Sequence, residues 1–140
     1  FNARLGDPET QVLVRRIRGN LGGALLACAR GEASGLALEV SPRPAACVVL
    51  AADGYPGRPR QGDAIDGVDA AAAQPGVQVF HAGTAFDGSG GLVTRGGRIL
   101  SVTADGDTLS HALDRVYGAA ALIRWPGVTY RRDIGRVTRG

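Results

Sequence analysis

Lysine is missing from this 140-residue chain, whose 16 basic residues are all arginines. The chain therefore carries neither a phosphate-binding P-loop lysine nor a lysine able to form a Schiff base. Its net charge of +3 would suit nucleic acid, but the arginines are scattered and there are only three Phe, three Tyr and one Trp. We expect no nucleic acid as a partner, because no RNA- or DNA-binding motif spacing is present. A mild positive excess instead suits a site for phosphates or carboxylates.

Cysteine is scarce and long apolar runs are absent. No run approaches the roughly 20 apolar residues that a membrane-spanning helix needs, so we expect no membrane association. Cys28 and Cys47 show no disulfide-framework spacing, and we expect two buried thiols in a cytoplasmic protein. With 44% hydrophobic and 21% charged residues the composition is globular, and the length suits one domain or the end of a larger one.

The first 31 residues predict a strand followed by two short helices. Residues 1–6 alternate as a strand does. Asp7 predicts the N-cap of a helix over 8–18, with proline at its first position. Asn20 predicts the N-cap of a second helix over 21–30.

Beyond residue 35 the pattern changes to that of a sheet. Strands are expected at residues 36–40, 46–51 and 77–82. A hairpin is expected between 92–95 and 98–103, because Gly96 and Gly97 suit a type I′ turn. The alanine run at 70–73 predicts a helical turn.

A long amphipathic helix completes the predicted elements, with Asp107 as its expected cap. Its apolar residues recur at helical spacing on one face: Leu109, Ala112, Leu113, Val116, Tyr117, Ala120 and Ile123. The fold class is therefore α+β, with domains at 1–35 and 36–140.

Asn2 and Arg4 fall on the same face of the predicted opening strand, since side chains two residues apart share a face. An amide oxygen suits Mg²⁺, and a guanidinium binds a carboxylate or phosphate through two hydrogen bonds. The helix start at Pro8 points free N–H groups at the same region. Spacing alone leaves two interpretations open: a metal and anion site, or an edge-strand amide beside a solvated arginine.

Six blocks of the sequence, in order, resemble the C-terminal part of the glycinamide ribonucleotide synthetases, also called phosphoribosylamine–glycine ligases. The opening block, FNARLGDPETQ, resembles the last part of their ATP-grasp core. The others are VVLAADGYPG at 48–57, VFHAGT at 79–84, LVTRGGR at 92–98, VTA at 102–104 with GDT at 106–108, and YRRDIG at 130–135. Several motifs in the same order are more specific than any one of them, and together they span essentially the whole chain.

Two positions depart from the family pattern. Leu5 stands where an aromatic residue is usual, which we interpret as a change in core packing. Asp53 replaces the first glycine of a Gly-Gly-Tyr-Pro loop, where glycine tolerates φ values that cost aspartate energy.

The resemblance implies a fold and a reaction. The fold is the end of an ATP-grasp domain followed by a small, sheet-rich, barrel-sandwich-like C-terminal domain. The reaction joins glycine to 5-phosphoribosylamine with ATP, through glycyl phosphate, and gives glycinamide ribonucleotide, ADP and phosphate in purine biosynthesis. The implied metal is Mg²⁺ or Mn²⁺. We expect the remainder of the synthetase, including a metal-binding Glu one position before Phe1, to be needed, and this chain alone to be inactive.

The resemblance also assigns residues to the site. Asn2 is the expected metal ligand and Arg4 the expected catalytic residue. The expected substrate-binding residues are Arg4, Asp7, Pro8, Glu9, Gly54, Tyr55 and Pro56. Another ATP-grasp ligase, or a non-catalytic interaction or regulatory module, remains an alternative.

Three other features of the sequence do not predict a catalytic or cofactor site. His81 and His111 have no cysteine or carboxylate at ligand spacing, so zinc is not expected. Residues 83–91 are rich in glycine but lack the strand-to-helix context of a dinucleotide site, so we expect a mobile loop. The charged residues at 131–133 form either a solvated tail or a contact with the ATP-grasp core.

Overall fold

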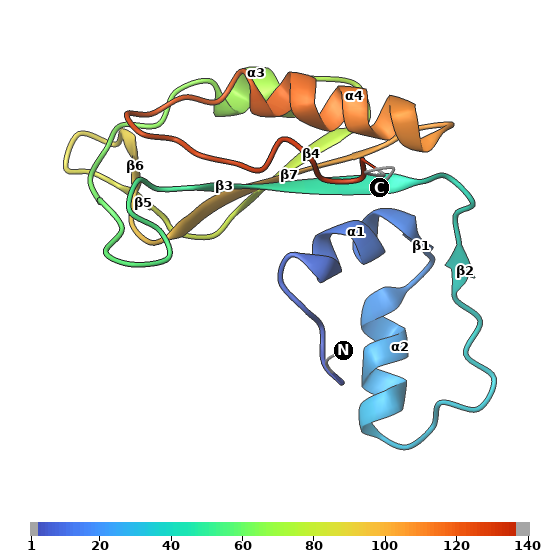
Figure 1. The fold of residues 1–140 in the computed structure, drawn as a ribbon. Coiled ribbons are helices and arrows are strands. Elements are labelled where there is room, and N and C mark those ends of the chain that lie inside the picture. The colour runs from blue at the N-terminus through green and yellow to red at the C-terminus, as the bar shows by residue number, and fades with distance from the viewer. Residues whose placement is uncertain (1–2, 137–140) are drawn as a thin grey trace.

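The computed structural model describes residues 3–136 (Figure 1). Its N-terminal segment contains α1 (Glu9–Arg16), β1 (Ile17–Arg18), α2 (Leu21–Ala29) and β2 (Glu39–Val40). The predicted second helix is confirmed, since the side chain of Asn20 caps α2 by accepting a 2.8 Å hydrogen bond from the amide of Gly23.

The predicted opening strand and first cap are wrong for the residues described. Residues 3–6 form a bend and irregular backbone, because no strand of the described chain pairs with them. Pro8 rather than Asp7 occupies the N-cap position of α1, without a side-chain cap. The carboxylate of Asp7 instead accepts a 2.8 Å hydrogen bond from Gln11 and pairs with Arg98.

Two predicted boundaries in this segment are also wrong. The first helix ends at Arg16, because Ile17 is extended and pairs with Val40 of β2. The strand expected at 36–40 is reduced to the two residues of β2, since its partner β1 is equally short.

A three-stranded antiparallel sheet forms the centre of the molecule. Its order is β3-β7-β4, with β3 at Ala45–Ala51, β7 at Arg98–Asp105 and β4 at Val77–His81. The strands expected at 46–51 and 77–82 are thus confirmed to within a residue at their ends.

The predicted hairpin is wrong. β6 (Leu92–Thr94) pairs with β5 (Thr84–Phe86), within the segment expected to be a loop, whereas β7 pairs with β3 and β4. Neither Gly96 nor Gly97 has a positive φ, so the type I′ turn does not form. Both glycines allow close packing instead: a Cβ on Gly96 would lie 3.0 Å from the Cα of Gly83, and one on Gly97 would strike the ring of Tyr55.

Two helices, α3 (Val68–Ala72) and α4 (Leu109–Ala120), cover one face of the sheet (Figure 1). The predicted apolar face of α4 is confirmed for Ala112, Val116 and Ala120, which are fully buried. It is wrong for Leu109, which is 45% exposed, and Ile123 lies beyond the end of the helix at Ala120. Thr108 caps α4 by accepting from the amide of His111. The expectation that Asp107 caps it is wrong, because that carboxylate pairs with Arg43.

Two residues expected in the interior are not buried. Leu5 is 57% exposed and Cys28 is exposed, because both belong to the N-terminal segment, whose apolar side chains find little cover in this chain. Cys47 is half-buried in β3, and burial raises the pKa of its thiol. Among the helices at 3–136, none is both long and apolar enough to cross a bilayer.

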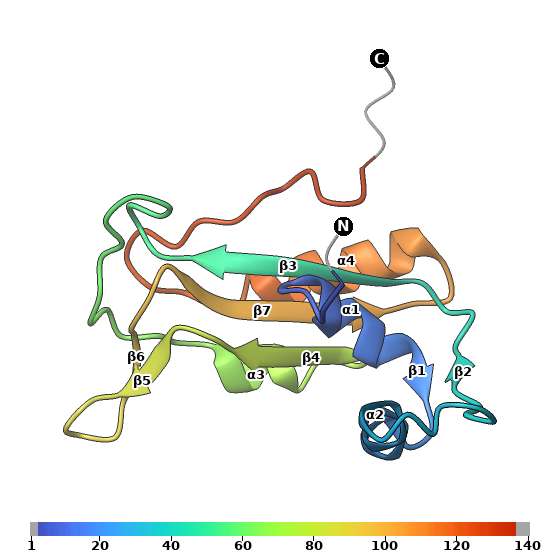
Figure 2. The same ribbon diagram turned by 90° about the horizontal axis from the view of Figure 1, so that it is seen from below.

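The first helix, α1, lies across the opposite face of the sheet (Figure 2). The strand register places Cys47 beside Thr103 and Val49 beside Ser101 on this face, since successive side chains alternate between faces. No residue of α1 is buried, so apolar burial alone does not hold the helix in place.

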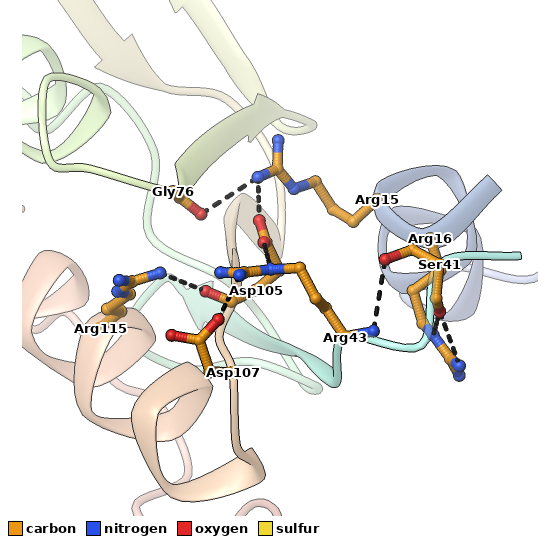
Figure 3. Close-up of polar contacts among 8 residues, drawn as sticks. All are labelled: Arg15, Arg16, Ser41, Arg43, Gly76, Asp105, Asp107 and Arg115. Carbon is orange, nitrogen blue, oxygen red and sulfur yellow. Dashed lines mark hydrogen bonds and ion pairs between the residues drawn. The ribbon is translucent and has the colours of Figure 1, made fainter. Parts of the chain in front are cut away.

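Polar contacts around Asp105, which we call the Asp105 cluster, attach the C-terminal end of α1 to the sheet (Figure 3). The Asp105 carboxylate, only 14% exposed, pairs with Arg15 of α1 and, at 2.9 Å, with Arg43. Its backbone carbonyl accepts a 2.8 Å hydrogen bond from Arg115 of α4. Burial alone would raise the pKa of Asp105, but hydrogen bonds from Arg15 and Arg43 outweigh it and hold this pKa below its usual value.

We expect Asp105→Asn to lower the free energy of unfolding at pH 7 by about 1–3 kcal/mol, because it removes charge-assisted hydrogen bonds to two arginines. The folded-state pKa of Asp105 is lowered, so its stabilisation is complete above the unfolded-state pKa and is lost as pH falls through the folded-state pKa. Urea denaturation at a series of pH values should show the two proteins converging in acid. Asp107→Asn, at a side chain 68% exposed, is the matched control and should cost less than about 1 kcal/mol. Equal losses in the two variants would contradict the special role of Asp105.

We also expect residues 36–140 to fold without the N-terminal segment. All members of the main core cluster lie between Ala46 and Trp125, so the truncation removes no side chain of that cluster. Its thermal unfolding should stay cooperative, with a lower midpoint because Arg15 is lost. A flat, gradual transition would show that the proposed domain boundary is misplaced.

Candidate functional site

The structure places the expected site residues on two segments. Asp7 and Pro8 precede α1, and Glu9 is its first residue. Gly54, Tyr55 and Pro56 lie in the loop that follows β3. Arg4 is exposed and donates to the adjacent carbonyl of Leu5. Asn2 lies outside the described residues.

Arg98, the first residue of β7, connects these two segments. Its Nη2 lies 3.0 Å from a carboxylate oxygen of Asp7, and its Nη1 donates to the backbone carbonyl of the same residue at 3.1 Å. The adjacent Gly97 packs against the ring of Tyr55. Arg98 therefore brings the start of α1 close to the loop after β3.

A pocket of about 410 Å³ opens beside Arg98, and we call it the Arg98 pocket. Its lining residues are Val49, Ala51, Tyr55, Arg98, Thr129, Tyr130 and Arg131. A smaller pocket of about 200 Å³ is lined by Pro8, Cys47, Val48, Val49, Arg131 and Ile134. The two adjoin through Val49 and Arg131, so the start of α1 and the Tyr55 loop face one continuous surface. Of the expected site residues, Tyr55 lines the first pocket and Pro8 the second. Asp7 lines neither and is connected to them only through its contacts with Arg98. The remaining four also line neither pocket: Arg4, Glu9, Gly54 and Pro56.

The loop after β3 holds its shape through Gly54. Gly54 has φ +81°, and a Cβ there would strike the carbonyl of Arg58. No described residue other than glycine has a positive φ. Asp53, the departure from the family pattern, therefore carries no backbone strain of that kind.

Arg131, which lines both pockets, forms an ion pair with Asp133. Its Nε and Nη2 contact the two carboxylate oxygens of Asp133 at 2.9 and 2.6 Å. This pair lowers the pKa of Asp133 and raises that of Arg131. The hydroxyl of Tyr117 on α4 donates to the Arg131 carbonyl and accepts from the amide of Ile134. The segment is therefore tied to the core helix.

Two arginines at one pocket favour an anionic ligand, because guanidinium groups form charge-assisted hydrogen bonds with carboxylates and phosphates. A third, Arg132, stacks 5.0 Å from the ring centroid of Tyr130. Sequence reasoning assigned no role to Arg98. The only local signal was its place after two glycines, and nothing in the pattern indicated that it reaches Asp7.

A metal site does not arise from the described part of the chain. Residues 3–136 bring together no group of three or more His, Cys, Asp or Glu side chains able to hold an ion. The donor set that Mg²⁺ prefers is several oxygens, so these residues do not fit a resident metal by themselves.

Comparison with known proteins identifies close relatives. Residues 45–137 match the family described as phosphoribosylglycinamide synthetase, C domain. The chain is 48% identical over 136 residues to the chloroplastic phosphoribosylamine–glycine ligase of Arabidopsis thaliana, covering 96% of this chain and 26% of that protein. It is 48% identical over 143 residues to the phosphoribosylamine–glycine ligase of Streptomyces coelicolor, covering 100% of this chain and 34% of that protein.

A solved structure shares the fold. The crystal structure of phosphoribosylamine–glycine ligase from Thermotoga maritima superposes with a TM-score of 0.79 at 38% identity, covering 94% of this chain and 32% of that chain. The α+β architecture with antiparallel sheets is therefore that of a ligase of this kind. The chain spans between 26% and 41% of the length of the first curated relatives that it matches.

We expect Gly97→Ala to destabilise the protein by about 1–3 kcal/mol, because the added methyl group would overlap the Tyr55 ring. Adding Tyr55→Ala should recover most of that loss, which a double-mutant cycle of unfolding free energies would measure. Gly88→Ala is the matched control, since a Cβ there meets nothing within 4 Å. Additive effects of the two substitutions would show that Tyr55 is not what Gly97 accommodates.

Proposed function

The chain belongs to the phosphoribosylglycinamide synthetase C-domain family, and from this we propose that it forms the C-terminal part of a phosphoribosylamine–glycine ligase. The reaction joins glycine to 5-phosphoribosylamine with ATP and yields glycinamide ribonucleotide, ADP and phosphate. The observation that carries this proposal is 48% identity to a relative of that name over 96% of the chain.

The chemistry would proceed in two steps. An oxygen of the glycine carboxylate attacks the γ-phosphorus of ATP, the bond to the bridging oxygen breaks, and ADP leaves. The resulting glycyl phosphate is attacked at its carbonyl carbon by the amine of 5-phosphoribosylamine. The amide bond forms, phosphate leaves and the amine loses a proton. Activation as an acyl phosphate replaces one difficult displacement with two easier ones.

The residues around α1 would position the first substrate. We assign Arg4 and the turn from Asp7 to Glu9 to glycine or the acyl phosphate, and residues 54–56 to the border of the site. The ion pair between Arg98 and Asp7 supports this assignment, because it fixes the start of α1 against the loop that carries Tyr55.

The metal of the reaction, Mg²⁺ or Mn²⁺, would need ligands from beyond residues 3–136, which hold no ligand group of their own. We propose that Asn2 contributes one amide oxygen. When bound, the metal would neutralise phosphate charge.

The remainder of the ligase is the partner that this chain would require. The N-terminal segment exposes many large apolar side chains: Leu5, Leu13, Leu25, Leu26, Leu36, Leu38 and Val40. Clustered exposed apolar residues mark a surface that another part of a protein covers. We propose that residues 1–35 end an ATP-grasp domain whose other elements cover this surface, and that 36–140 form the sheet-rich, barrel-sandwich-like C-terminal domain.

The full-length protein supplied with ATP, glycine and 5-phosphoribosylamine tests the proposed function. Mass spectrometry should detect glycinamide ribonucleotide in amounts equal to the ADP released. ADP release without that product, or dependence on an amino acid other than glycine, would indicate another ATP-grasp ligase.

We expect two substitutions in the full-length protein to separate the roles of its opening residues. Asn2→Ala should reduce kcat and increase the Mg²⁺ concentration required, because one hard oxygen ligand is lost. Arg4→Ala should raise the KM for glycine with little change in the Mg²⁺ requirement, because it removes an anion contact. Kinetics across Mg²⁺ and glycine concentrations would measure both, and an Asn2→Ala protein with normal turnover and Mg²⁺ dependence would remove Asn2 from the site.

A further inference from the structure

We propose that Tyr117 of α4 is a positioning residue for the candidate site: its hydroxyl group holds the segment at 130–136 so that Arg131 lines both pockets. Tyr117 itself lines neither of them, so it would act through Arg131 and would not touch a substrate. The inference rests on the proposed function, since it names a residue outside the site on which the geometry of the site depends.

The segment at 130–136 has no regular structure of its own. After α4 the chain runs back along the free edge of β3 (Figure 2). Its last backbone pairing with the sheet is at Thr129, which exchanges hydrogen bonds of 3.0 and 2.8 Å with Ala51. Residues 130–136 then form neither helix nor strand. The sheet therefore fixes the chain only up to Thr129, two residues before Arg131.

The hydroxyl group of Tyr117 supplies the hydrogen bonds that hold the rest of the segment. It donates to the carbonyl of Arg131 at 3.1 Å and accepts from the amide of Ile134 at 2.9 Å. The other hydrogen bonds of the segment are internal, from Arg131 and Arg136 to Asp133. Within the described chain, no side chain except that of Tyr117 joins 130–136 to the rest of the protein by a hydrogen bond or ion pair.

Tyr117 is well placed to act as an anchor because it belongs to a rigid element. Val116, the residue before it, is fully buried against the sheet. The Tyr117 ring packs on the main core, with the ring centroid of Tyr130 6.5 Å away. The end of the segment also lies close to α4, since a Cβ on Gly135 would be 2.7 Å from Leu113. A side chain supported in this way holds a neighbouring group more precisely than a loop does.

The ion pair of Arg131 with Asp133 does not replace this anchor. Both partners belong to the same segment, and their side chains are 73% and 57% exposed, so the pair moves with the segment. The pair orients the guanidinium relative to its own backbone, whereas the Tyr117 hydroxyl fixes that backbone relative to the core. A displaced backbone would move Arg131 in both pockets at once, because the two pockets share it.

Hydrogen exchange of the full-length protein tests the anchor. Tyr117→Phe removes the hydroxyl group and keeps the ring, so the packing of α4 is preserved. We expect the amide of Ile134 to exchange at least about fivefold faster, because it loses its acceptor, while amides of β3 and β7 exchange as before. Ser110→Ala removes an exposed hydroxyl from the same helix and is the matched control, which should change neither. Unchanged exchange at Ile134 in Tyr117→Phe would overturn the proposal.

Steady-state kinetics test the positioning role. In an active ligase, Tyr117→Phe should raise the KM for one substrate by about threefold to tenfold with little change in kcat. That substrate should be the one whose KM rises in Arg131→Gln. Adding Tyr117→Phe to Arg131→Gln should cause little further loss, because a residue that acts through Arg131 then has nothing to position. A merely structural role would instead give losses that add in the double variant, and additive losses would contradict the proposal.

The two measurements distinguish this proposal from the proposed function. An active ligase in which Tyr117→Phe frees the segment but leaves every KM unchanged would overturn the positioning role alone. A full-length protein that forms no glycinamide ribonucleotide would overturn the ligase function, and exchange at Ile134 would then still decide whether the Tyr117 hydroxyl holds the segment.

Discussion

The carboxylate of Asp105 is the point on which the arrangement of the two segments depends. It accepts from Arg15 on α1 and from Arg43 just before β3, while α1 itself contributes no buried side chain. A helix with half-buried but no fully buried residues gains less from the hydrophobic effect than a core helix does. Its position across the sheet therefore depends also on ion pairs at its two ends: the Asp105 cluster at one, and the contact of Asp7 with Arg98 at the other. The second contact is also the one that organises the candidate site.

Elements whose pattern reports burial were predictable from the sequence. β3, β4 and α4 are apolar on the side that faces the core, and periodicity measures that directly. The hairpin was not predictable, because Gly96 and Gly97 serve close packing against Gly83 and Tyr55. Glycine looks the same in a sequence whether it supplies a positive φ or an absent side chain.

The candidate site was likewise predictable only in part. Asp7, Pro8 and Tyr55 were indicated by resemblance. Pro8 and Tyr55 line two adjoining pockets, and Asp7 contacts Arg98 beside them. The role of Asp7 as a helix cap was wrong because its carboxylate is taken by Arg98, distant in sequence, and local capping rules contain no information on such a competitor. Leu5 and Cys28 were expected inside because apolar residues usually are. Their exposure follows from the little cover that the described chain gives its N-terminal segment.

The double use of Arg98 has a thermodynamic consequence. The same guanidinium holds Asp7 at the start of α1 and lines the pocket beside Tyr55. An anion bound in the pocket would share this one side chain with Asp7, so the free energy of placing α1 and the free energy of filling the pocket would not be independent. Such coupling is reciprocal: if an occupant changes the free energy of placing α1, the placement of α1 changes the binding free energy of that occupant by the same amount.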